Sequence, residues 1–275
     1  ALFTESGTHP VLVIAVDDLP VMSAIQIALT QGAVEDVSAY SLNPQSVART
    51  GVHILQLMSA VIISESLLEG TIAEKLASKW CPQDTQIINA ALILSADHEL
   101  NASSFAARVA AGVDANPYAV VMAGLSVLQG YKHGKNSERV AAFVREVGEA
   151  RYARQAIAER LQRGEKLSGF GHWLYPDEDP RATALLTLLH QSQHTDPAVM
   201  ALIDAIMQET QAMIGKAPNI DFALVALEYA LRLPRGAALM LFALGRTVGW
   251  IAHAIEQYNA GDMIRPRARY IGRLP

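Results

Sequence analysis

The sequence predicts an all-α protein, and three observations support that prediction. Apolar residues recur at helical spacing, for example at Val140, Phe143, Val144 and Val147. The alternation of apolar and polar residues that is typical of half-buried strands is essentially absent. The composition is 51% hydrophobic but only 6% aromatic. Such a core, rich in Ala, Leu, Val and Ile, is typical of packed helices.

Glycine and proline mark the expected ends of these helices, because neither continues a helix well. Asp179-Pro180 fits an N-cap followed by a first helical position, which places Arg181 in the first turn. The short apolar run 11–16 fits either a strand or a buried helical turn. The expected stops of the three clearest helical patterns, which start near residues 140, 202 and 222, are Gly164, Gly215 and Pro234.

Size and composition limit the class of protein. A chain of 275 residues can form one large domain or two unequal ones. A net charge of −5 argues against a general nucleic-acid binder. The single cysteine, Cys81, cannot form an internal disulfide, so we expect a reducing cytoplasm. Residues 1–10 lack signal-peptide features, and the apolar stretches 51–64 and 115–131 are interrupted, so a soluble protein is expected.

Three loops rich in Gly, Pro and Asp carry the residues with the clearest chemical meaning. They span residues 130–136, 168–180 and 215–220, and loops held by helices often carry catalytic groups. His172, between Gly171 and Trp173, lies shortly before Arg181. That pair is suited to hold a carbonyl oxygen and a carboxylate of one small molecule. With His133 and Asp221, it suggests enolate chemistry on a keto acid.

Each of these residues also has a purely structural interpretation. Arg181 is either exposed, paired with Asp177 or Asp179, or bound to a substrate carboxylate. His172 and His133 also fit ordinary surface or turn histidines. If His133 is functional, the neighbouring Lys132 is expected to depress its pKa and keep the ring neutral.

Asp221 opens a predicted helix, where it serves either as a cap or, if burial raises its pKa, as a general base. Arg246 interrupts an apolar helical pattern and would need an anionic partner if buried. The basic segment 264–273 fits either a solvated tail or recognition of carboxylates or phosphates. The run Asp97-His98-Glu99 lacks metal-ligand spacing, so no metal site is predicted.

Taken together, these fragments resemble the citrate synthase family. The resemblance runs from Asn43 to the C-terminus, and six motifs in family order make it specific. The matching stretches are Ala96–Ser103, His133-Gly134, Gly169–His172 with Asp179–Ala182, Pro218–Phe222, Arg246–His253 and Arg265–Gly272.

The resemblance implies a citrate synthase-like fold and a homodimer. A large helical domain (1–135 and 243–275) and a smaller one (136–242) would surround the active-site cleft. By resemblance, Asp221 removes the α-proton of acetyl-CoA, His133 donates to the enolate oxygen, and His172 polarises the keto group of oxaloacetate. The coenzyme A thioester is a substrate, and no cofactor or metal is expected. The residues implied in binding the carboxylates are His98, Arg181, Arg246 and, from the neighbouring subunit, Arg265.

The sequence departs from the family pattern at Ser95, where a histidine is usual, and at Lys135-Asn136, where a second glycine is usual. By comparison with the family pattern, we also expect the usual N-terminal elements to be reduced or missing in this sequence. By the resemblance, the changes at Ser95 and around His133 fall where the thioester and the CoA arm would lie, so they bear on CoA affinity and acyl preference. Three readings of the function remain open. The chain is a citrate or 2-methylcitrate synthase, an enzyme that cleaves citryl-CoA, or a non-catalytic paralogue that binds a tricarboxylate or CoA.

Overall fold

The computed structural model describes residues 19–64, 70–96, 99–269 and 271–272, and helices dominate these ranges. No β-strand occurs within them, and the isolated β-bridge that they contain pairs Phe170 with Pro218. The all-α prediction is therefore confirmed, whereas the run 11–16 lies outside the described residues. The α-helices are α1 (Val21–Glu35), α2 (Pro44–Ile63), α3 (Ile72–Trp80), α4 (Thr85–Ser95), α5 (Ala102–Ala111), α6 (Pro117–Leu128), α7 (Asn136–Val147), α8 (Ala153–Gln162), α9 (Pro180–Gln191), α10 (Pro197–Ile214), α11 (Ile220–Ala230) and α12 (Ala237–Ala260).

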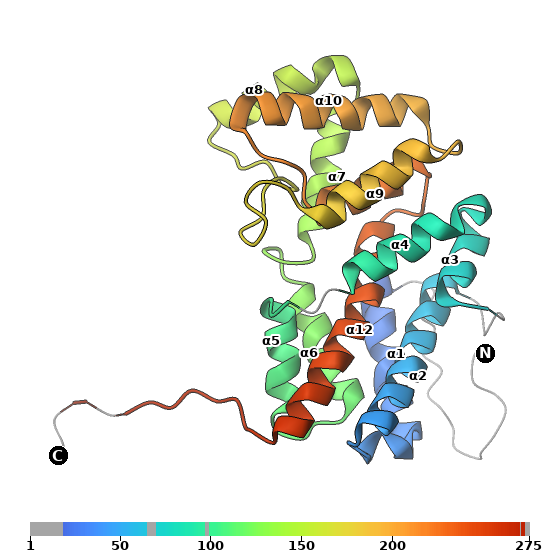
Figure 1. Ribbon diagram of the computed structural model, residues 1–275, viewed down its shortest axis with the longest axis vertical. Coiled ribbons are helices and arrows are strands. Elements are labelled where there is room, and N and C mark those ends of the chain that lie inside the picture. Colours follow the sequence, from blue (N-terminus) through green and yellow to red (C-terminus); the bar gives the residue numbers. More distant parts are fainter. Residues whose placement is uncertain (1–18, 65–69, 97–98, 270, 273–275) are drawn as a thin grey trace.

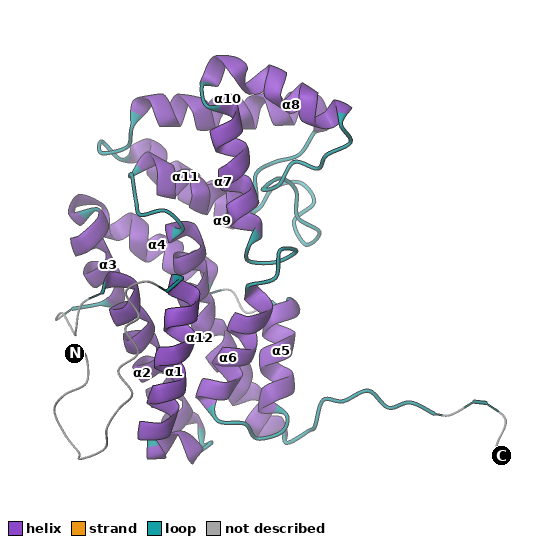
Figure 2. Cartoon of the chain, turned by 180° about the vertical axis from the view of Figure 1, so that it is seen from behind, coloured by secondary structure: helices purple, strands orange, loops and turns teal. Residues whose placement is uncertain are grey.

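The helices form two groups (Figure 1). One group contains α1 to α6 together with α12, and the other contains α7 to α11. α12 packs against α2, α4, α5 and α6 in the first group, and its N-terminal part also contacts α11. Figure 2 shows the same division from behind. The domain limits at residues 136 and 243 stay a prediction, and α12 begins before the second of them.

Close contacts between helices depend on two glycines. A Cβ atom at Gly124 in α6 would lie 2.6 Å from the ring of Trp250 in α12. At Gly245 it would lie 2.5 Å from the carbonyl oxygen of Leu92 in α4. Because a real Cβ essentially never comes so close to other atoms, glycine lets α12 approach both neighbours. Arg246, the residue after Gly245, is only 1% exposed in this packed region.

Two helices, α2 and α12, are long and apolar enough to cross a membrane by length and composition alone. In α12, 72% of the apolar window is buried inside the protein, and Arg246 lies within the helix. Such burial is typical of the central helix of a packed bundle. Of the two interrupted stretches noted in the sequence, 51–64 falls largely within α2, whereas 115–131 contains the shorter helix α6.

Two of the four predicted helix boundaries are confirmed, and the other two are wrong. Gly215 is the C-cap of α10, and Asp179 is the N-cap of α9, as predicted. The helix expected to run from Val140 to Gly164 is wrong, because Gly148, with φ of 72°, ends α7. A short 3₁₀ turn (Ala150–Tyr152) then leads into α8. α11 likewise ends at Ala230, before Pro234, and Arg232 adopts a φ of 52°.

The C-terminal segment leaves the helical body. α12 ends at Ala260 with Gly261 as its C-cap, and the residues described beyond it form no regular element. Figures 1 and 2 show this tail extending away from α5 and α12. Arg265 lies on the tail and is exposed.

Candidate active site

Two loops distant in sequence are joined directly beside the start of α11. Phe170 forms the isolated bridge with Pro218, and the backbone N–H of Asn219 donates to the carbonyl of Gly169 at 2.8 Å. The Asn219 side-chain amide donates to the carbonyl of Gly171 at 3.1 Å. These bonds bring His172, the next residue, to the N-terminal end of the helix that carries Asp221.

Asp221 does not cap its helix. The N-cap of α11 is Asn219, whose side-chain oxygen accepts from the backbone N–H groups of Asp221 (3.1 Å) and Phe222 (3.4 Å). The Asp221 carboxylate instead accepts a hydrogen bond from the side-chain amide of Asn136 at 2.8 Å. The capping interpretation of Asp221 is therefore wrong, and the carboxylate is available for chemistry.

Burial sets the acid strength of Asp221. Removal from water raises the pKa of its carboxyl, although the Asn136 amide and the Arg181 charge pull that pKa down. The nearby Asp179 carboxylate acts in the same direction as burial. The net result is a pKa above the ordinary aspartate value, which suits a general base better than a fully solvated carboxylate does.

His133 lies on the turn that leads into α7. Its Nε2 is 2.8 Å from the hydroxyl of Ser103, near the start of α5. The ring meets Phe242 edge to face, with ring centroids 6.4 Å apart. Burial, together with the positive charge of Arg246, lowers the pKa of the imidazole, so the ring is neutral near pH 7.

The expectation that Lys132 depresses the pKa of His133 is wrong as to its cause. The direction is correct, but the second cause after burial is Arg246 on α12. The Lys132 ammonium instead lies over the Tyr131 ring, 5.7 Å from its centroid. The charge that lowers the pKa of His133 therefore comes from Arg246, which folding brings close, and not from the adjacent Lys132.

His172 is partly buried and has a defined orientation. Its Nδ1 accepts a hydrogen bond from the backbone N–H of Leu174 at 3.2 Å. In the neutral ring the proton then resides on Nε2, which becomes the donor nitrogen. The ring also packs on Tyr175 at a centroid distance of 5.1 Å, while Trp173 is 78% exposed.

Arg181 pairs with Asp179 through two nitrogens. Nε donates to Oδ1 at 2.9 Å and a terminal nitrogen donates to Oδ2 at 3.0 Å. The guanidinium carbon lies 5.1 Å from the centroid of the Tyr175 ring. Burial is the largest single influence on Asp179 and favours the neutral form. The Arg181 guanidinium and the backbone N–H groups of Arg181 and Ile220 together outweigh it, so the pKa of the Asp179 carboxyl lies below its usual value. The pairing with Asp179 foreseen from the sequence is therefore present.

The other three predicted substrate-binding residues are Arg246, Arg265 and His98. Arg246 is 1% exposed in α12, 5.6 Å from the Phe242 ring centroid, and its charge acts on His133. Arg265 lies on the extended tail, so this chain does not bring it to the other residues. His98 lies outside the described residues. Over the ranges that the structure describes, no group of three His, Cys, Asp or Glu side chains is arranged to hold a metal ion.

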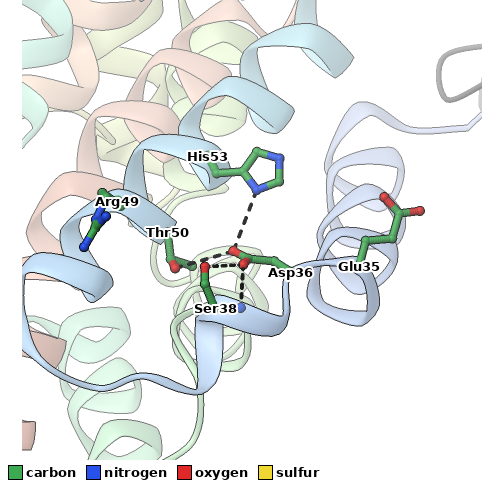
Figure 3. Close-up of a pocket in the computed structure, with 6 residues that line it drawn as sticks. All are labelled: Glu35, Asp36, Ser38, Arg49, Thr50 and His53. Carbon is green, nitrogen blue, oxygen red and sulfur yellow. Dashed lines mark hydrogen bonds and ion pairs between the residues drawn. The ribbon is translucent and has the colours of Figure 1, made fainter. Parts of the chain in front are cut away.

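Two cavities lie apart from these residues, and no predicted site residue lines either of them. One, of about 400 Å³, lies where α7 meets the start of α12, beside Glu228 and Arg235. The other, of about 320 Å³, lies where α1 ends against α2 (Figure 3). There Asp36 accepts from Tyr118 at 3.2 Å, and the Tyr118 hydroxyl lies 2.8 Å from Nδ1 of His53. This network ties α1, α2 and α6 together.

Sequence reasoning missed the residues that hold the catalytic candidates. Asn136 contacts Asp221, and Ser103 contacts His133. Asp179 accepts hydrogen bonds from the Arg181 side chain and from the backbone N–H of Ile220 at the start of α11. Asn136 was noticed only as a departure from a family motif. The available signal was its position three residues after His133, because a turn keeps such residues close together. That signal placed Asn136 near His133, but it did not indicate the contact with Asp221.

Comparison with known proteins identifies the family to which this chain is related. Residues 16–267 match the family model of the citrate synthase C-terminal domain. Citrate synthase 2 of Bacillus subtilis is 30% identical, with 91% of this chain covering 72% of that protein. The 2-methylcitrate synthase of Shewanella oneidensis is 31% identical, with 70% of this chain covering 52% of that protein.

Solved structures show the same fold. Citrate synthase from Thermotoga maritima superimposes with a TM-score of 0.77 at 24% identity, covering 94% of this chain and 73% of that one. The Thermoplasma acidophilum enzyme, solved with carboxymethyl coenzyme A and oxaloacetate, gives a TM-score of 0.75 at 24% identity over 93% and 74% of the two chains. The chain therefore belongs to the citrate synthase family.

Proposed function

We propose that this protein condenses acetyl-CoA with oxaloacetate and hydrolyses the product to citrate and CoA. The observation that supports this most strongly is the link between a partly buried carboxylate and a neutral imidazole. Asp221, with its raised pKa, is hydrogen-bonded to Asn136 on the turn that carries His133. Enolisation of a thioester requires such a base and such a donor side by side.

The first step is removal of a proton from the methyl carbon of the thioester. Asp221 takes that proton, and the electron pair moves onto the carbonyl oxygen. His133 donates a hydrogen bond to the oxygen as charge develops, which is worth about 3–4 kcal/mol for a well-placed donor. With Nε2 held by the Ser103 hydroxyl, Nδ1 would carry the donated hydrogen.

The second step forms the carbon–carbon bond. The enolate carbon attacks the keto carbon of oxaloacetate, and Nε2 of His172 supplies a proton to the keto oxygen. Water then adds to the citryl thioester, and the CoA thiol leaves. Closure of the two helix groups around the substrates would exclude water until the new bond exists.

Several cations are proposed to bind the two carboxylates of oxaloacetate. Arg181 and Arg246 come from the same chain, together with His98. A guanidinium has five N–H donors, so Arg181 is able to bind a substrate carboxylate alongside Asp179. Arg265 is proposed to act at the site of a second copy in a homodimer, which is compatible with a tail that leaves its own body. We propose a cytoplasmic location and no bound cofactor or metal.

A thiol-release assay tests this function directly. Oxaloacetate is combined with acetyl-CoA or propionyl-CoA, and citryl-CoA is tested alone. Release with acetyl-CoA in preference to propionyl-CoA supports the proposal. A preference for propionyl-CoA would indicate a 2-methylcitrate synthase, as in the Shewanella relative. Turnover of citryl-CoA alone would indicate the cleavage reaction, and oxaloacetate binding without turnover would indicate a non-catalytic binder.

A further inference from the structure

Asn136 and Asp221 make a contact that the reaction described above does not require. The Asn136 amide nitrogen lies 2.8 Å from Oδ2 of Asp221, although 85 residues separate the two in sequence. Asn136 is the first residue of α7, and its backbone N–H donates to the carbonyl of His133 at 2.8 Å. One turn thus carries the proposed enolate donor at one end and a hydrogen-bond donor to the proposed base at the other.

The two oxygens of the Asp221 carboxylate differ in their contacts. Within the part of the chain that the structure describes, Oδ2 accepts the Asn136 amide and Oδ1 accepts no hydrogen bond. An oxygen already holding a hydrogen bond has a weaker hold on a new proton. Proton transfer should therefore occur at Oδ1.

We propose that Asn136 is a positioning residue that holds Asp221 by Oδ2, so that Oδ1 faces the substrate as the base. This inference rests on the proposed condensation. Asn136 touches no reacting atom, and it acts by fixing the carboxylate relative to the His133 turn. A rotating carboxylate would have to pay orientational entropy in every turnover, and the amide removes that cost.

The contact should also set the pH range of the enzyme. The charged groups that act on Asp221 are Arg181 and Asp179, both at the start of α9, and both are retained when Asn136 is changed. Asn136 favours the ionised carboxylate, so its removal raises the pKa of Asp221. Because the base must be ionised, the acidic limb of kcat/KM would then lie at higher pH.

The test compares Asn136→Ala with Asn89→Ala, a matched change at an exposed helical asparagine in α4. For Asn136→Ala, we expect kcat to fall about tenfold and the acidic limb of kcat/KM to rise by about one pH unit. The KM for oxaloacetate should change little, and Asn89→Ala should match the unmodified enzyme. If Asn136→Ala does not fold, Asn136→Ser replaces it.

A second measurement does not depend on turnover. Carboxyl-carbon NMR follows the titration of Asp221 in the unmodified protein and in the variant, and an upward shift of its pKa is expected. If the unmodified enzyme is active and Asn136→Ala leaves both kcat and the acidic limb of kcat/KM unchanged, the role of Asn136 is overturned while the proposed condensation stands. An unmodified protein without turnover would reject the proposed condensation and with it the purpose of the contact. An unshifted NMR titration would reject the contact itself.

Discussion

The Asp179 carboxylate accepts a hydrogen bond from the backbone N–H of Ile220 at 3.0 Å, across 41 residues of sequence. The same carboxylate is the N-cap of α9 and pairs with Arg181. Because Ile220 immediately precedes Asp221, this one side chain fixes a proposed substrate-binding cation relative to the proposed base. The side chain of Asp179 is only 1% exposed.

Replacement of Asp179 by asparagine should destabilise the protein strongly. The Arg181 side chain is only 11% exposed and would lose its carboxylate partner. Removing one member of a buried ion pair typically costs about 3–5 kcal/mol. Urea unfolding at pH 7 measures the loss, and Asp177→Asn, at an exposed position in the same loop, is the control. A variant as stable as its parent would show that the pair contributes no net stability.

The difference in the free energy of unfolding between the parent protein and Asp179→Asn should depend on pH in a defined direction. The pKa of Asp179 is lowered from 3.8 by folding, so its charged form stabilises the native state above that value. The contribution is fully present above about pH 4 and is lost as pH falls through the depressed folded pKa. The difference in the free energy of unfolding between the parent and Asp179→Asn should therefore become smaller only below about pH 4.

Local patterns in the sequence predicted the all-α class and the start of α9, and they singled out individual chemical candidates. Capping preferences placed Asp179 at the start of α9 because a cap depends on adjacent residues only. The break at Gly148 was missed because the apolar pattern continues on both sides of it. The electrostatic partner of His133 is Arg246 rather than Lys132, and that pairing arises only when α12 packs beside the turn. Contacts of this kind depend on tertiary structure, which periodicity does not encode.

Asp221→Asn should reduce kcat by at least about a hundredfold, because an amide does not act as a general base. Asparagine has nearly the same size, so the helix and the oxaloacetate affinity should be preserved. Thiol release measures kcat, and calorimetry measures oxaloacetate binding. A loss of less than tenfold would remove Asp221 from the role of base.

Arg246→Gln should raise the pKa of His133. The Arg246 charge disfavours the protonated ring, so its removal lets the ring bind a proton at higher pH. NMR titration of the imidazole protons measures this shift on folded protein. Arg232→Gln, at a side chain that is 80% exposed and paired with Asp196, is the control. An unchanged titration of His133 in Arg246→Gln would mean that burial alone keeps the ring neutral.

Arg265→Ala should raise the KM for oxaloacetate without unfolding the protein, if the tail serves the site of a second copy. Mixing this variant with Asp221→Asn provides a sharper test. In a mixed dimer, one site would combine both defects, while the other would hold an intact Asp221 from one chain and an intact Arg265 from its partner. Activity at low oxaloacetate should therefore rise above that of either variant alone. If Arg265 acts within its own chain, or not at all, every site in the mixture keeps a defect and mixing restores nothing.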